Sequence, residues 1–143
     1  DTVWTEFGPL WDGTNWSERG CQVVPSICRV LKSDPSSLCI KSSLSSNTVI
    51  KDCGTTFQVG VLRLRPGTTV LPNCGPTNIR LVMLMALEGA QGVEITVGGQ
   101  TVKDFKQGDG HAVVFDDSFE HSIHHGGKYD LLVVVAVLAH PNL

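Results

Sequence analysis

Three polar residues of this chain are candidates for chemistry: His121, Arg80 and Asn73. The imidazole of a histidine can take up or release a proton near neutral pH, so His121 could act as an acid, a base or a hydrogen-bond donor. The guanidinium of Arg80 is a fixed donor that could hold a carbonyl or enolate oxygen. The amide of Asn73 could contact a ligand. We therefore predict that these three residues are catalytic.

Each candidate also has a purely structural interpretation, which the sequence leaves open. His121 could be the remnant of a site that is no longer used, and Asn73 could tie a turn through its own side-chain amide. Arg80 could pair with a buried carboxylate, either Asp116 or Asp117. These two aspartates are more typical of residues that orient a turn than of catalytic acids.

The elements that must position these residues are mostly short strands. Apolar segments separated by Gly, Pro and Asn turns predict strands within residues 1–20 and over 57–64, 79–87, 92–97, 100–103, 111–115 and 131–138. A period of 2 places Arg80 on the same strand face as Val82 and Leu84. Residues 25–32 predict a helix, because a proline suits its first turn and Asp34-Pro35 ends it. The pattern predicts a mainly β protein, an antiparallel barrel or jelly roll, with a short N-terminal helix.

The bulk composition is that of a globular domain and argues against two classes of partner. The chain has 143 residues, 17% of them charged, and a net charge of -3 without a basic run, so we expect no nucleic acid partner. No apolar stretch reaches the roughly 18 residues of a membrane span. Exposed sheet edges could pair into a homodimer, although no motif specifies one.

Cysteine usage bears on the compartment in which the chain resides. Five cysteines and the glycosylation sequon Asn15-Trp16-Ser17 favour an oxidising environment. The chain begins at Asp1 rather than at methionine, as expected for a mature chain after signal-peptide removal or for a trimmed chain. We expect the protein to be secreted or to reside in the lumen of the endoplasmic reticulum or vacuole.

Several separate motifs occur along the chain in a recognisable order. They are Cys21 and Cys28 before Leu31, RPGT at residues 65–68, PNCGPTNIRL at residues 72–81, FDDSFEH at residues 115–121, and a final His140-Pro141. In these motifs the chain resembles the aspartyl/asparaginyl β-hydroxylase family, whose members are cupin-like double-stranded β-helix enzymes that use iron and 2-oxoglutarate. The resemblance implies a single domain over residues 1–143, with a disulfide-stapled cover at 1–55 and a β-barrel core at 56–143.

The resemblance breaks at both cofactor sites. Members of this family bind iron with two histidines, one in each of two corner motifs; His121 matches the second, and Asn73 stands in place of the first. An amide oxygen is a poor ligand for such a metal compared with imidazole. Four polar positions that hold the 2-oxoglutarate carboxylates in the family fall here on aliphatic residues, namely Leu62, Val82, Leu84 and Leu131. Aliphatic groups cannot pair a buried carboxylate, so we expect neither a metal nor another cofactor.

The same resemblance supports a disulfide between Cys21 and Cys28. Cys39 lies within the serine-rich stretch 33–48 and Cys53 follows it, so the two are the second expected pair, although a bond between Cys53 and Cys74 stays open. Left unpaired, Cys74 could be a reactive thiol, but a buried inert thiol is the more common case. We expect His124 and His125 to face solvent, His111 to begin a strand and His140 to cap the last one.

An apolar pocket in this scaffold would suit an apolar small-molecule substrate. We expect the four aliphatic residues to line it, with Phe119 and Trp4 at its rim. Such a site can catalyse a cyclisation or cycloaddition by holding reactants close and by stabilising oxyanion charge. In its small size, cysteines and altered redox site, the chain is also similar to the secreted fungal hetero-Diels–Alderases of tropolone–sesquiterpenoid biosynthesis. That similarity implies that His121 assists water loss to an o-quinone methide, while Arg80 and Asn73 hold the tropolone oxygens.

Two other functions stay open at the level of sequence. One is an iron/2-oxoglutarate hydroxylase with an unusual ligand set. The other is a non-catalytic secreted module that binds a small molecule or a glycan.

Overall fold

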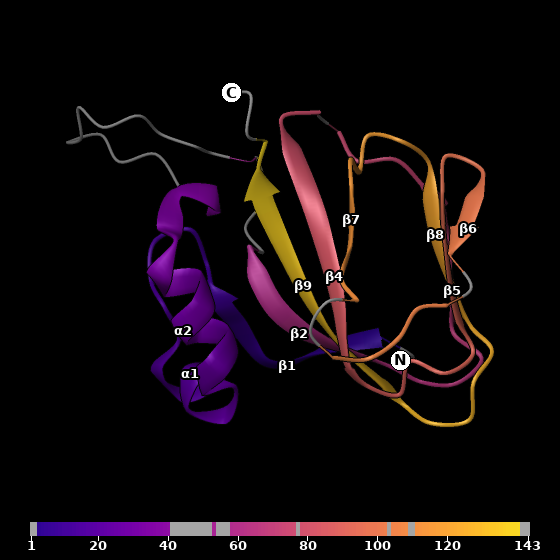
Figure 1. Ribbon diagram of the computed structural model, residues 1–143, viewed down its shortest axis with the longest axis horizontal. Coiled ribbons are helices and arrows are strands. Elements are labelled where there is room, and N and C mark those ends of the chain that lie inside the picture. The colour runs from indigo at the N-terminus through magenta and orange to yellow at the C-terminus, as the bar shows by residue number, and fades with distance from the viewer. Residues whose placement is uncertain are drawn as a thin grey trace.

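The computed structural model describes residues 3–40, 53, 58–76, 78–102, 104–108 and 111–140, arranged as two antiparallel sheets (Figure 1). One sheet contains, in spatial order, β1 (Val3–Trp11), β2 (Val59–Leu64), β9 (Leu131–Ala139), β4 (Arg80–Glu88) and β7 (Val113–Phe115). The other contains β3 (Thr69–Asn73), β8 (His121–His125), β5 (Val93–Val97) and β6 (Gln100–Val102). This arrangement confirms the predicted mainly β, cupin-like jelly roll.

Two short helices form a cover on one side of the five-stranded sheet (Figure 1). They are α1 (Glu18–Val23) and α2 (Pro25–Ser33), followed by the 3-10 turn η1 (Pro35–Ser37). The second helix confirms the prediction for residues 25–32. The first helix was not predicted. Its start is nevertheless marked by Ser17, whose hydroxyl accepts a hydrogen bond from the amide of Gly20 at 3.0 Å.

The five-stranded sheet is buried on both faces. Along β4, Val82, Leu84 and Ala86 face the four-stranded sheet, whereas Met83 and Met85 face the N-terminal cover. Strand β9 divides in the same way, which explains its nearly continuous apolar sequence LLVVVAVLA. Each fully buried leucine or valine contributes roughly 1.5–3 kcal/mol, so these two apolar layers hold both sheets and the cover together.

Among the strands, β3 and β8 are the two that the sequence did not predict. The sequence of β3 contains Pro72, and β8 reads HSIHH, so neither shows the apolar alternation expected of a strand. Both become strands through pairing, with Val70 opposite Ile123 and Asn73 opposite His121. The remaining predicted strands are observed with small shifts at their ends, apart from positions 57 and 103, which lie outside the described residues.

No helix in the part of the chain that the structure describes is long and apolar enough to cross a membrane.

Candidate functional site

Two turns meet at one end of the β3–β8 pair and form the candidate site. The first turn leaves β3 after Asn73 and enters β4 at Arg80; the second joins β7 to β8 over residues 116–120. Because β3 and β8 are antiparallel neighbours, Asn73 is the strand partner of His121. The structure therefore brings together two of the three residues predicted to be catalytic, and we call this pair and its two turns the Asn73–His121 corner.

His121 is held in one orientation at this corner. Its Nδ1 atom lies 2.9 Å from the Phe119 carbonyl oxygen, and its ring centroid lies 5.2 Å from that of Phe115. A carbonyl can only accept a hydrogen bond, so Nδ1 carries the hydrogen, and in the neutral imidazole Nε2 then carries the lone pair. His121 shares a strand face with the inward-facing Ile123, so the half-buried imidazole belongs to the inner side of the barrel. Its Nε2 can serve as a base or a hydrogen-bond acceptor.

Asn73 is exposed and takes part in its own turn. Its Nδ2 donates a hydrogen bond of 2.9 Å to the Leu71 carbonyl oxygen, which agrees with the turn-tying interpretation. This bond engages the amide nitrogen and not the amide oxygen, so Oδ1 is the end of the side chain suited to accept a bond from a ligand.

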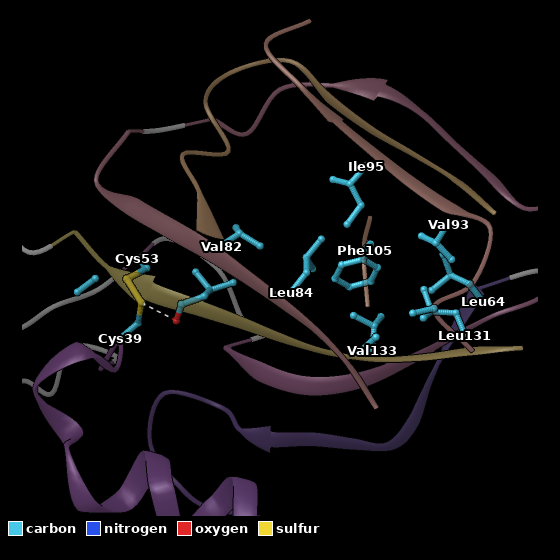
Figure 2. Packing of buried hydrophobic residues seen from close by; sticks show 14 residues of the cluster. Cys39, Cys53, Leu64, Val82, Leu84, Val93, Ile95, Phe105, Leu131 and Val133 are labelled. Atoms are coloured by element: carbon cyan, nitrogen blue, oxygen red, sulfur yellow. Dashed lines mark hydrogen bonds between the residues drawn. A yellow bond between two sulfur atoms is a disulfide. The ribbon is translucent and has the colours of Figure 1, made fainter. Parts of the chain in front are cut away.

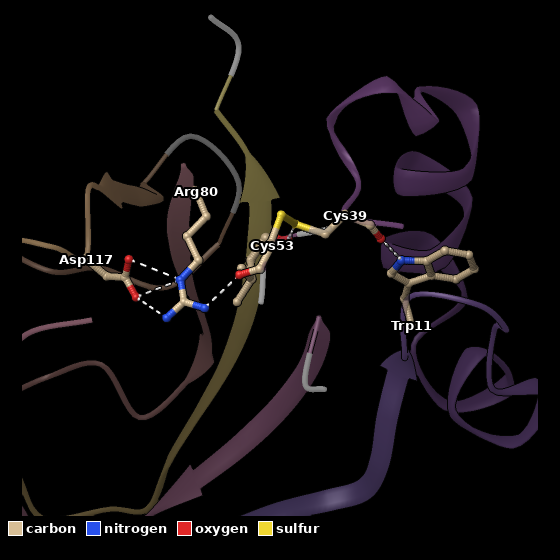
Figure 3. Close-up of a disulfide and its surroundings, with 6 residues drawn as sticks. Trp11, Cys39, Cys53, Arg80 and Asp117 are labelled. Carbon is tan, nitrogen blue, oxygen red and sulfur yellow. Dashed lines mark hydrogen bonds and ion pairs between the residues drawn. A yellow bond between two sulfur atoms is a disulfide. The ribbon is translucent and has the colours of Figure 1, made fainter. Parts of the chain in front are cut away.

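Arg80 does not reach the corner as a free donor. Its side chain is buried, and its guanidinium donates to both carboxylate oxygens of Asp117 at 2.9–3.3 Å. The remaining nitrogen, Nη1, donates to the Cys53 carbonyl oxygen at 2.9 Å (Figure 3). The ion-pair interpretation is therefore the one observed, with Asp117 as the partner. A direct bond from Arg80 to a substrate, as first expected, would require breaking this buried pair, which costs several kcal/mol.

Asp116 shapes the second turn. Its Oδ1 accepts hydrogen bonds from the hydroxyl of Ser118 at 2.7 Å and from the amide of the same residue at 2.9 Å. These two bonds, with a smaller contribution from the charge of His140, lower the pKa of Asp116 below its usual value. The expected role of this aspartate in orienting the turn agrees with these contacts.

The two turns are packed directly against each other. The amide of Gly75 donates to the backbone oxygen of Asp117 at 2.6 Å. A Cβ atom at position 75 would overlap the Asp117 carboxylate, so the close approach of the turns requires glycine.

The four aliphatic residues expected to line a pocket are brought together between the two sheets. Val82, Leu84 and Leu131 are buried there, and Leu62 packs against them at the edge of the cluster. Figure 2 shows that the labelled members pack with aromatic and aliphatic side chains from the other elements, including Phe105 and Ile95. They form the inner core of the barrel.

The two aromatic residues expected at the rim lie in different places. Phe119 stands on the second turn of the corner with 59% of its surface exposed. Trp4 is the strand partner of Arg63 in β1–β2, and so faces away from the inner cluster that contains Leu62. The guanidinium groups of Arg63 and Arg65 cover its ring, at 5.9 Å and 5.3 Å from the centroid. Trp4 is thus separated from the corner by the sheet.

One neighbour of the corner was missed by sequence reasoning. Leu71 of β3 is 73% exposed, next to the turn that carries Asn73. Its position directly before the PNCGPTNIRL motif was visible, but the exposure of a leucine cannot be inferred from a strand that the sequence does not reveal.

Both expected disulfides are formed, between Cys21 and Cys28 and between Cys39 and Cys53. Such bonds are consistent with a secreted or lumenal protein. The residual thiol, Cys74, is exposed, so the expectation of a buried cysteine is wrong.

The adjacent histidines His124 and His125 were both expected to face solvent. This is correct for His124, which is exposed, and wrong for His125, which is 0% exposed. Neighbouring residues of β8 face opposite sides, and His125 satisfies both ring nitrogens locally. Its Nδ1 accepts a bond from the amide of Gly127, so Nε2 donates to the Tyr129 carbonyl oxygen at 2.6 Å. His111 lies two residues before β7 and does not begin it, whereas His140 directly follows β9, in the expected capping position.

The fold and motifs place the chain among known proteins. A model of the family described as aspartyl/asparaginyl beta-hydroxylase matches residues 1–141. The chain belongs to the aspartyl/asparaginyl β-hydroxylase family. It is 28% identical over 141 residues to the human protein named aspartyl/asparaginyl beta-hydroxylase, and 33% identical over 128 residues to rat aspartate beta-hydroxylase domain-containing protein 2. These alignments cover 98% and 87% of this chain but only 16% and 33% of the respective relatives.

Solved structures with a cupin fold resemble part of this β-hydroxylase family member. A predicted oxalate decarboxylase from Thermotoga maritima is 21% identical with a TM-score of 0.49, covering 59% of this chain and 67% of that one. The cupin domain of Cnp3 from Schizosaccharomyces pombe is 20% identical with a TM-score of 0.46, covering 57% of this chain and 52% of that one.

The residues of this family member do not fit the iron and 2-oxoglutarate that its resemblance to the hydroxylases implies. The strand partner of His121 is an amide, and within the described ranges no three His, Cys, Asp or Glu side chains come together to hold a metal ion. The nearby cation of Arg80 is already neutralised by Asp117, so it cannot receive a second carboxylate without losing the first. The donor set is therefore poor for both groups.

Proposed function

We propose that this family member acts on an apolar small molecule at the Asn73–His121 corner without using iron or 2-oxoglutarate. One observation carries the proposal. An amide stands directly opposite an imidazole whose Nε2 lone pair is set by the bond from Nδ1 to Phe119. This pair is a poor metal site but a competent acid–base and hydrogen-bonding site.

The reaction that we propose is a dehydration followed by a hetero-Diels–Alder cycloaddition in secondary metabolism. Nε2 of His121 takes the proton of a ring hydroxyl while the carbon–oxygen bond to a neighbouring leaving hydroxyl breaks. The proton departs with that hydroxyl as water, and an o-quinone methide remains. A terpene alkene then adds across it, forming one carbon–carbon and one carbon–oxygen bond. Both steps are redox-neutral, so no oxidant or reductant is required.

The corner offers suitable groups for both reactants. The Asn73 Oδ1 can accept a hydrogen bond from a hydroxyl of the tropolone, while the exposed side chains of Leu71 and Phe119 can contact hydrocarbon. Burying these two apolar surfaces against a terpene would contribute through the hydrophobic effect and would hold the reactants close together.

Family membership favours a second candidate, an iron/2-oxoglutarate hydroxylase with an unusual ligand set. Calorimetric titration with Co(II), a stand-in for Fe(II), separates the two. We expect weak Co(II) binding by the wild type and binding tighter by about tenfold or more, or about 1.4 kcal/mol per tenfold, in Asn73→His, which supplies a second imidazole. Asn73→Gln keeps an amide and serves as the control. Tight Co(II) binding by the wild type, together with 2-oxoglutarate turnover lost in His121→Ala, would overturn the proposal.

The proposed reaction is tested directly with a hydroxymethyl tropolone and humulene. Product is followed by chromatography and mass spectrometry, with a reaction lacking protein as the background. Loss of a general acid–base should lower the rate by about 10²–10⁴-fold in His121→Ala, whereas His124→Ala, on the outer face of the same strand, should retain it. If product forms at the same rate with wild type, with His121→Ala and without protein, the protein does not catalyse this reaction. A non-catalytic binding module would then be the better description.

A further inference from the structure

We infer that Arg80 and the Cys39–Cys53 disulfide position the Asn73–His121 corner, so that the corner is assembled only in the oxidised protein. The inference rests on the proposed function for the identity of the site. It assigns Arg80 a positioning role in place of the direct contact with substrate that its sequence suggested.

The Cys39–Cys53 disulfide joins the N-terminal cover to the corner (Figure 3). On the side of the cover, the backbone oxygen of Cys39 accepts a hydrogen bond of 2.7 Å from the indole of Trp11. The adjacent Leu38 forms a bridge with Leu138 of β9, which fixes this segment to the five-stranded sheet. The Cys39 half of the disulfide is therefore anchored independently of the corner.

On the other side, the disulfide is connected to the corner through Arg80. The Cys53 carbonyl oxygen accepts the Nη1 bond of Arg80, and the other two guanidinium nitrogens bind Asp117. The backbone oxygen of Asp117 in turn accepts the amide bond of Gly75, two residues after Asn73. Arg80 thus connects the disulfide to both turns that carry the site.

Burial makes this connection strong. Arg80 is only 8% exposed, so each donor of its guanidinium needs a protein partner. If the Cys53 carbonyl moved away, Nη1 would lose its partner and become an unsatisfied buried donor, which is unfavourable. The least costly response is for Arg80 to turn towards water, which would draw Asp117 with it and loosen the turn before His121.

The oxidation that forms this anchor is a two-electron step. The Cys39 and Cys53 thiols lose two protons and two electrons to a disulfide oxidant such as glutathione disulfide, which is released as two glutathione thiols. In the folded protein the two residues are 0% and 1% exposed, so an external thiol has little access to the bond. The anchor is therefore set during folding, and a chain folded in a reducing compartment would have a loosened site.

The second disulfide provides a matched control. Cys21 lies in α1 and Cys28 in α2, so their bond joins the two helices of the cover. Removing it should lower the overall stability without altering the contacts of Arg80.

The test compares Cys39→Ser/Cys53→Ser with Cys21→Ser/Cys28→Ser. Imidazole NMR of protein labelled with ¹⁵N-histidine reports the tautomer of His121 and the hydrogen exchange of its Nδ1–H. We expect exchange about tenfold faster or more in the first variant, because local opening exposes this proton, and an unchanged signal in the second. An unchanged His121 signal in a folded Cys39→Ser/Cys53→Ser protein would overturn the inference.

Arg80→Lys examines the same connection with the disulfide intact. Lysine keeps the positive charge but cannot bind Asp117 and Cys53 simultaneously through a planar fork. Arg63→Lys is its control, because Arg63 also forms ion pairs, with Glu6 and Asp130, away from the corner. We expect the His121 signal to change in Arg80→Lys alone. If Cys39→Ser/Cys53→Ser does not fold, the comparison of Arg80→Lys with Arg63→Lys tests the inference. Equal His121 signals in these two lysine variants would reject it.

The NMR measurement needs no substrate, so it is independent of the proposed reaction. A corner that loosens in the anchor variants of a protein without cycloaddition activity would reject the proposed function and retain the positioning role. If the anchor variants keep cycloaddition activity and show an unchanged His121 signal, the positioning role is rejected and the proposed function is retained.

Discussion

At the turn between β7 and β8, two adjacent aspartates have different tasks. The half-buried Asp116 accepts hydrogen bonds from Ser118 within its own turn, while the buried Asp117 neutralises Arg80 across the two turns. In the sequence these residues are equivalent, since both are carboxylates in one motif. Their burial and partners are properties of the folded turn, and they separate a residue that shapes the loop from one that holds the site together.

The low pKa of Asp116 leads to a prediction for Ser118→Ala. The Ser118 hydroxyl bond is the largest cause of the lowered pKa, so its removal should raise the pKa of Asp116 towards its usual value. The Cγ chemical shift of Asp116, followed against pH by NMR, measures the change. Ser122→Ala in β8 is the control and should leave that titration unchanged.

The same variant has a defined dependence of stability on pH. A carboxylate whose folded pKa is depressed stabilises the fold above its unfolded pKa, and this contribution is lost as pH falls through the folded pKa. Ser118→Ala should therefore be less stable than wild type at neutral pH, with the difference shrinking in acid below the usual carboxylate range. A urea unfolding difference that grows in acid would contradict this account.

At the scale of single elements, β8 shows how pairing overrides a weak strand sequence. Its HSIHH segment has one aliphatic residue, yet it hydrogen-bonds with β3 on one side and β5 on the other. Alternation then sends His121 and His125 inward and His124 outward. The sequence could not assign these faces, because three histidines and a serine carry no clear apolar periodicity.

Two variants of adjacent histidines test this alternation. His125→Leu removes both local hydrogen bonds of a fully buried ring, and should lower the free energy of unfolding by about 1–3 kcal/mol. His124→Leu changes an exposed side chain, and should alter it by less than about 0.5 kcal/mol. Urea denaturation measures both values, and a larger loss in His124→Leu would mean that the two faces are reversed.

At the scale of the whole molecule, one sheet serves as the common wall of two apolar layers. The inner layer lies between the two sheets, and the outer layer lies between the five-stranded sheet and the helical cover. The two disulfides differ with respect to these layers. The Cys39–Cys53 bond belongs to the buried inner cluster, whereas Cys21 and Cys28 border a surface pocket of about 490 Å³ beside α2.

This difference predicts the order in which the disulfides are reduced in the native protein. Dithiothreitol should reduce the Cys21–Cys28 bond about tenfold faster or more, because access to the sulfur limits thiol–disulfide exchange. Pulsed alkylation followed by peptide mass mapping measures the order, with the exposed Cys74 labelled before any reductant is added. Faster labelling of Cys39 and Cys53 would show that the inner bond is reached from solvent.

The amino-acid sequence by itself predicted the jelly-roll class, most strands and one helix, and its spaced motifs carried the family resemblance. It left the second disulfide open between Cys39–Cys53 and Cys53–Cys74, which the fold decided. The predicted elements and the resemblance follow from local signals, namely apolar alternation, turn residues and spaced motifs, which need no knowledge of distant contacts. The sequence also identified Asn73 and His121 as a changed pair within the family pattern.

Only the tertiary structure decided what the candidate residues contact. Arg80 could be a substrate donor or an ion-pair partner until the fold placed Asp117 and the Cys53 carbonyl around it. Trp4 moved to the far side of a sheet, and His125 became buried, because strand pairing assigns faces. Burial and long-range pairing depend on chain segments far apart in sequence, so these assignments emerge only when the two sheets and the cover are packed together.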